Sequence, residues 1–199
     1  MSNIRSKETS AELQALMKRG FAALSNGRFE DAGDYCQQAL KIQPDLVQAH
    51  FLVGLVGLEA KDRATAFSAF QSAVRLDKDH AAAWAQLARM YMSEGQVNKA
   101  DAALRETQRI RPTDPIVLDL IGMTLSQMGE DGVAKAFFAR ANTSRPNHPP
   151  YMLNLANNLV YHGDIETADV IFHDVIRLLP DSPQAHWALA GSTKAEDGE

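Results

Sequence analysis

The feature that most limits the fold of this chain is a period of 34 residues that runs through almost all of it. Alanine recurs at this spacing five times, at Ala32, Ala66, Ala100, Ala134 and Ala168. A period of about 20–50 residues is typical of repeat proteins, in which one small supersecondary unit stacks on the next. The sequence therefore predicts a stack of five similar units.

Two more positions of the unit recur at the same spacing as the alanines. Four residues after each alanine there is a large apolar residue or a cysteine, and seven residues after it there is a small or β-branched residue. Because positions i, i+4 and i+7 share one face of an α-helix, each unit should contain a helix that buries this face. The first set is Cys36, Phe70, Leu104, Phe138 and Phe172, and the second is Ala39, Ala73, Thr107, Ala141 and Val175.

A second helix precedes this one in each unit, as residues 81–112 show. Trp84, Leu87 and Tyr91 lie on one helical face, and Gly95 follows where a tight turn is needed. Glycine recurs at this turn position in most units, and proline closes most of them. The turn glycines are Gly27, Gly95, Gly129 and Gly163, and the closing prolines are Pro44, Pro112, Pro146 and Pro180.

This pattern resembles the tetratricopeptide repeat, whose signature is W-x2-L-G-x2-Y, then A-x3-F, then P. The small residue of the first helix is matched by Gly20, Gly54, Ala88, Gly122 and Ala156. The resemblance implies an all-α fold: a right-handed superhelical solenoid of five helix pairs within residues 10–182, plus a C-terminal capping helix. The repeats would be 13–46, 47–80, 81–114, 115–148 and 149–182.

The second repeat departs most from the family pattern. It has His50 at the aromatic position, Gly57 in place of a large residue and Lys61 in place of the turn glycine. A surplus glycine inside a helix costs about 0.5–1 kcal/mol relative to alanine. We therefore expect the second repeat to be the least stable.

Local signals predict where the ends of the helical region lie. Residues 9–12 read Thr-Ser-Ala-Glu, a capping box, so the first helix should begin near Ser10 after a flexible arm at 1–9. Asp114 and Ser182 each precede a proline, which is a common start of a helix. Residues 183–199 should therefore form a helix that caps the fifth repeat, followed by an acidic tail.

Composition excludes several classes of function. The formal net charge of −5 argues against a nucleic-acid-binding protein, which needs a basic face. The single cysteine, Cys36, fits a reducing compartment, and no apolar run is long enough for a membrane helix or a signal peptide. We expect a cytoplasmic protein that is not inserted in a membrane, and the sequence does not specify its oligomeric state.

No pattern of residues predicts catalysis. The sequence contains no P-loop, dinucleotide fingerprint, HExxH, CxxC or nucleophile elbow. No two of the six histidines are three or four residues apart, so no helical metal site is predicted. Cys36 replaces Phe or Leu of the other repeats and should be a buried apolar residue. We expect no enzymatic activity, cofactor or metal.

The resemblance implies instead a groove lined by the first helices of successive repeats, which would bind a peptide or protein segment. The apolar members of that lining could alternatively pack between neighbouring helices. Arg89 and Asp119 would face one another across adjacent helices, and the family's Lys and Asn clamp is replaced by Met17 and Phe21. The predicted groove residues are Met17, Phe21, Phe51, Leu55, Arg89, Met92, Asp119, Met123, Asn154, Asn157, Tyr161 and Trp187.

Two other functions fit the same pattern. The stretch 182–198 is similar to the helix that follows the repeats in bacterial tetratricopeptide–sulfotransferase proteins, so the chain could be the regulatory or substrate-presenting part of a larger enzyme. It could also be a scaffold that assembles with itself through the ends of the solenoid.

Overall fold

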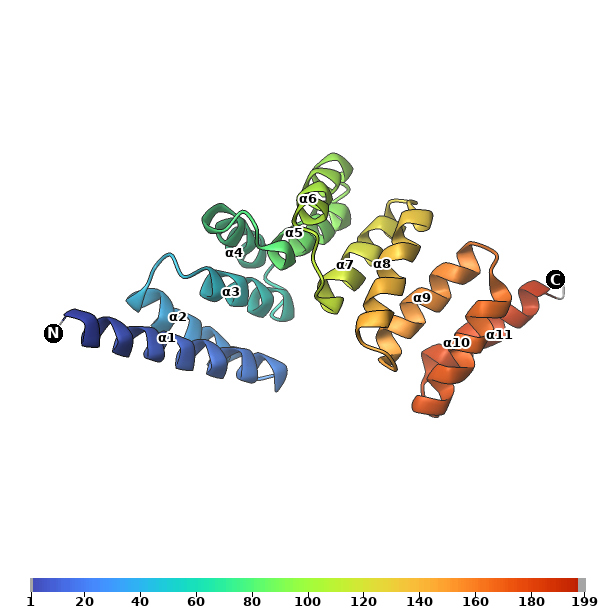
Figure 1. Cartoon of the computed structure of the whole chain (residues 1–199), viewed down its shortest axis with the longest axis horizontal. Helices are drawn as coiled ribbons and strands as arrows, with labels where there is room; N and C mark the ends of the chain where they lie inside the picture. Colours follow the sequence, from blue (N-terminus) through green and yellow to red (C-terminus); the bar gives the residue numbers. More distant parts are fainter. Residues whose placement is uncertain (1, 197–199) are drawn as a thin grey trace. The chain divides into compact units, whose positions relative to one another are not determined.

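A computed structural model describes residues 2–196 of the chain, with side chains from residue 9 to residue 191. Residues 2–196 form eleven α-helices and no strand, which confirms the predicted all-α fold (Figure 1). The helices are α1 (Ser2–Ser25), α2 (Phe29–Ile42), α3 (Val47–Glu59), α4 (Arg63–Leu76), α5 (Ala81–Ser93), α6 (Val97–Ile110), α7 (Pro115–Gln127), α8 (Asp131–Ser144), α9 (Pro149–Tyr161), α10 (Ile165–Leu178) and α11 (Pro183–Glu196).

The chain divides into two compact units, Met1–Leu87 and Ala88–Glu199, and the division falls within α5. In the first unit α1 packs against α2, α2 against α3, and α3 against α4. In the second unit each helix from α7 to α11 packs against the next one. The pairs α1–α3, α7–α9 and α9–α11 also touch, so the first helices of successive predicted repeats are neighbours within each unit.

Small residues allow the two helices of a pair to approach closely. The five periodic alanines are fully buried, as are the apolar residues Phe70, Phe172 and Cys36 four residues later in their helices. A Cβ built on Gly54 would lie 2.4 Å from a ring atom of Phe70, and one on Gly122 would lie 2.7 Å from a ring atom of Phe138. In these two pairs the aromatic ring of the second helix therefore occupies the space above a glycine of the first.

Replacing Ala134 by phenylalanine should lower the free energy of unfolding by about 1–3 kcal/mol, the usual cost of overpacking. Ala134 is 0% exposed in α8, which packs against α7. Ala136 lies in the same helix but is exposed, so Ala136→Phe is the matched control and should change stability little. Thermal melting followed by circular dichroism measures both, and equal midpoints would show that Ala134 is not at a tight crossing.

At one position of the repeat, a side chain with a ring N–H hydrogen-bonds to the backbone at the end of the preceding repeat. Trp84 Nε1 donates to the carbonyl oxygen of Lys78 at 2.9 Å. His50 and His186, which replace tryptophan at this position, hydrogen-bond through Nε2 to the carbonyl oxygens of Pro44 at 2.9 Å and Pro180 at 2.8 Å. Histidine can therefore replace tryptophan here because both offer a ring N–H to the end of the preceding repeat.

The glycine turns and the helix start at Asp114 follow the predicted chemistry. Gly129, with φ of 80°, adopts the left-handed conformation that glycine enters without steric cost, as do the other three turn glycines. Lys61 adopts the same conformation in the second repeat, with φ of 59°. Asp114 caps α7 by accepting from the backbone N–H of Ile116 at 2.8 Å, so the helix start predicted there is confirmed.

The predicted start of the first helix was wrong. α1 begins at Ser2 rather than near Ser10, so the capping-box residues lie inside a helix that is already formed. Most of the segment 1–9 is therefore helical, and its flexibility stays a prediction. α11 begins at Pro183 as expected and continues to Glu196, while the end of the predicted acidic tail, 197–199, lies outside the described residues.

Cys36 is buried, as predicted from its position in the repeat. Its side chain belongs to an apolar core that includes Leu13, Leu16 and Leu52. Burial raises the pKa of the Cys36 thiol to about 11, so the thiol stays protonated at neutral pH. This cysteine is a packing residue.

Candidate functional site

Four of the predicted groove residues lie in the first unit, and they are mostly covered by their neighbours. Met17 is only 4% exposed and belongs to the core around Cys36, so the structure places it in the interior rather than at a surface. Phe21 is half-buried against the same core. Phe51 packs its ring against those of Phe70 and His80, with centroids 5.7 Å and 4.6 Å apart, and Leu55 is also half-buried.

The other eight lie in the second unit and differ widely in exposure. Asp119 in α7 is buried, and Arg89, Met92 and Asn154 are half-buried. Tyr161 at the end of α9 is 80% exposed, and Trp187 in α11 is 85% exposed. The remaining two, Met123 and Asn157, are exposed as well.

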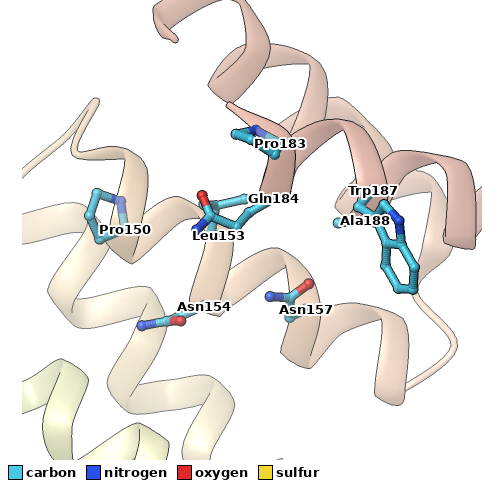
Figure 2. Close-up of a pocket in the computed structure, with 8 residues that line it drawn as sticks. All are labelled: Pro150, Leu153, Asn154, Asn157, Pro183, Gln184, Trp187 and Ala188. Carbon is cyan, nitrogen blue, oxygen red and sulfur yellow. The ribbon is translucent and has the colours of Figure 1, made fainter. Parts of the chain in front are cut away.

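Three of these residues meet in a groove of about 730 Å³ formed by α9 and α11 (Figure 2). They are Asn154 and Asn157 from α9 and Trp187 from α11. Its volume is in the range of small-molecule pockets, about 300–1,000 Å³. The complete lining is Pro150, Leu153, Asn154, Asn157, Pro183, Gln184, Trp187 and Ala188, and none of these residues carries a formal charge.

The sequence pattern did not point to the five other lining residues. Pro150 and Leu153 lie on the same helix as the two asparagines, and Pro183, Gln184 and Ala188 lie beside Trp187. Four of them lie three or four residues from a predicted member, and Ala188 lies four residues after Gln184. This spacing is the signal that could have identified them, because residues three or four apart share a helix face. The groove therefore uses one continuous stripe of each helix.

Trp187 is exposed because α11 packs through a different face. Ala185 is fully buried and forms a small core with Met152 of α9 and Val175 of α10. His186 is turned toward the carbonyl oxygen of Pro180. The indole of Trp187 therefore lies at the open side of the groove, as Figure 2 shows.

A buried carboxylate lies behind one wall of the groove. Asn154 Nδ2 donates to both carboxylate oxygens of Asp119, at 2.9 Å and 3.0 Å. Burial raises the pKa of the Asp119 carboxyl above its usual value, and the Asn154 hydrogen bond and the nearby His148 partly offset this. The arrangement predicted for Arg89 and Asp119, facing one another across adjacent helices, stays a prediction.

The described residues offer little for other kinds of site. No helix among residues 2–196 is long and apolar enough to cross a membrane. In the same part of the chain, no group of three or more histidine, cysteine or acidic residues is placed to hold a metal ion. The groove between α9 and α11 is therefore the site that we consider further.

Comparison with known families agrees with the helical architecture. Two family models match, both described as tetratricopeptide repeat, one over residues 13–46 and the other over residues 57–123. Together they cover about half of the chain. The chain belongs to the tetratricopeptide-repeat proteins.

Individual relatives are distant. Anaphase-promoting complex subunit 3 of Schizosaccharomyces pombe is 22% identical over 152 residues, which are 76% of this chain and 23% of that protein. The chain thus spans less than a quarter of the length of the curated relatives that it matches. These matches give no support to the sulfotransferase association.

Solved structures share the fold at low sequence identity. PilF of Pseudomonas aeruginosa has a TM-score of 0.78 at 18% identity, over 96% of this chain and 86% of that one. YrrB, described as a tetratricopeptide protein with an unusual peptide-binding site, has a TM-score of 0.60 at 20% identity, over 94% and 97% of the two chains.

Proposed function

We propose that this chain is a non-enzymatic protein-interaction module that binds a peptide segment of a partner in the groove between α9 and α11. The observation that carries this proposal is the 85% exposure of Trp187 beside a groove lined by apolar and amide side chains. Tryptophan is enriched among the residues that contribute most to protein–protein binding. An indole that is exposed to solvent in this way provides a large, rigid contact surface for a partner.

The chemistry of the lining supports a peptide as the ligand. Asn157 and Gln184 carry amides that can each donate and accept a hydrogen bond, as a peptide backbone requires. Leu153 and Pro183 provide apolar contact for side chains. The fold itself commonly mediates protein–protein interaction, and the peptide-binding site of the structural neighbour YrrB is a precedent for this class of ligand.

Trp187→Ala should abolish most peptide binding without changing stability. Truncation of a central tryptophan anchor typically costs at least about 2 kcal/mol, which is roughly thirtyfold in affinity. The peptides to use are those selected by the full chain from a library of short random peptides displayed on phage, with affinities measured by calorimetry. The thermal midpoint should not move, because the indole makes little contact with the core.

Val170→Ala is the matched control for this experiment. Val170 is 61% exposed on α10 and does not line the groove, so its truncation should leave peptide affinity unchanged. If no selected peptide depends on Trp187, the groove is not a peptide-binding site and the proposal fails.

A further inference from the structure

The hydrogen bond between Asp119 and Asn154 fixes the orientation of an amide in the groove wall. An ionised carboxylate only accepts hydrogen bonds, so the group facing it at 2.9 Å and 3.0 Å must be the NH₂ of Asn154. The carbonyl oxygen of that amide then faces the other way. Figure 2 shows this oxygen on the side of Asn154 toward Asn157 and Trp187.

Reversing this amide would be costly. It would replace two hydrogen bonds to a charged acceptor by contact between two oxygens that both carry negative charge. The carboxylate cannot turn away into water, because Asp119 is only 9% exposed in α7 and α7 packs against α9. Asn154 therefore presents an acceptor to the groove and not a donor.

Asn157 provides a contrast on the same helix. Its side chain is exposed, and no other side chain in the described part of the structure holds its amide by a hydrogen bond. That amide can rotate to present either its oxygen or its NH₂ to a ligand. The two asparagines are thus chemically identical but differ in what they can recognise.

We propose that Asp119 is a positioning residue that makes Asn154 a fixed hydrogen-bond acceptor, so that the groove selects an extended peptide segment with a free backbone N–H at this point. This inference rests on the proposed function. The donor is a backbone N–H rather than a charged side chain because no lining residue carries a formal charge. The segment is extended because most backbone N–H groups of a helix are already hydrogen-bonded within it.

The orientation can first be tested without any ligand, by nuclear magnetic resonance of the side-chain amides. Asp119→Asn should shift the side-chain NH₂ signals of Asn154 and speed their exchange with water, while those of Asn157 should hardly move. Asp119→Leu, which removes every polar atom, is the second variant in case one of the two fails to fold. Unchanged Asn154 signals in a folded variant would overturn the inference.

The selectivity is tested with a peptide selected by the full chain, synthesised with a methyl group on one backbone nitrogen at a time. At one position this methyl group should weaken binding to the parent protein about tenfold, the loss expected for one hydrogen bond. The same methyl group should have no further effect on Asn154→Ala, and a reduced effect on Asp119→Asn. Asn157→Ala should weaken binding but keep the full sensitivity to that methyl group.

The outcomes separate this inference from the proposed function. If binding depends on Trp187 but no methylated position is specific to Asn154, the groove binds peptides and Asp119 does not set their orientation. If the sensitive position responds to Asn154→Ala and equally to Asn157→Ala, the inference is again overturned. If no peptide depends on Trp187, the proposed function fails, and the inference fails with it.

Discussion

Phe138→Ala is expected to lower the free energy of unfolding by about 3–5 kcal/mol, the range measured for removal of a buried aromatic ring. Phe138 is 3% exposed, and its ring lies against Gly122 of α7. Glycine has no side chain that could move into the space left by the ring, so the cavity should persist. Because domains are stable by only about 5–15 kcal/mol, urea unfolding followed by circular dichroism should show a large loss.

The fit between these two residues can be measured with a double-mutant cycle. Gly122→Ala alone should destabilise the protein, because the new Cβ would lie 2.7–3.0 Å from three atoms of the Phe138 ring. In a Phe138→Leu background the same methyl group should cost much less. The interaction free energy between the two sites should then be in the range of about 0.5–3 kcal/mol found for residues in contact.

Gly132→Ala is the control for the glycine substitution. Gly132 is in α8, and the nearest atom to a Cβ built there is Cε1 of His162 at 3.8 Å, which is ordinary contact. Alanine is favoured over glycine inside a helix by about 0.5–1 kcal/mol, so this variant should be neutral or more stable. Additive effects at positions 122 and 138 would mean that the ring does not rest on the glycine.

Gly57→Ala is expected to destabilise the first unit by about 1–3 kcal/mol, although alanine is the better helix former. A Cβ at residue 57 would lie 2.9 Å from the backbone nitrogen of Ala66 and 3.1 Å from the carbonyl oxygen of Asp62. Both atoms belong to the start of α4, whose hydrogen bonds hold them in place. The two helices would have to separate to admit the methyl group.

The matched control is Gly33→Ala in α2, where a Cβ would have no described atom within 4 Å beyond its chain neighbours and the backbone of its own helix. That variant should be stabilised by the preference of a helix for alanine over glycine, and its urea midpoint should rise or stay the same. If the Gly57→Ala and Gly33→Ala variants had the same urea midpoint, α3 and α4 would not approach each other as closely as described.

Much of the fold could be predicted because its determinants are local. The 34-residue period, the turn glycines and the Asp114–Pro115 start depend on helix periodicity and capping, which can be read within a few residues of the chain. The start of α1 was mispredicted for the same reason: a capping box favours a helix start but cannot exclude a helix that begins earlier. From the sequence pattern, Gly57 is only a surplus glycine in a helix. In the structure it lies where two helices cross closely, and sequence spacing does not reveal how closely helices cross.

The candidate site could be predicted only in part. Repeat position identified Asn154, Asn157 and Trp187, which do meet in the groove. The same rule placed Met17 there, although its side chain is buried. The burial of the same repeat position differs from one repeat to the next, because it depends on the size of the neighbouring side chains in three dimensions. The contact between Asp119 and Asn154 joins residues 35 positions apart, and helix periodicity carries no information about which polar groups will pair across two helices.

The burial of the single cysteine has a practical consequence for spectroscopy. Since the Cys36 thiol is 0% exposed and its pKa is raised to about 11, it should react very slowly with maleimides at neutral pH. A cysteine introduced at an exposed position would then be the preferred target for labelling, without any need to remove the native one. A fluorophore attached to Gln184→Cys, at the edge of the groove, would report directly on the arrival and departure of a ligand.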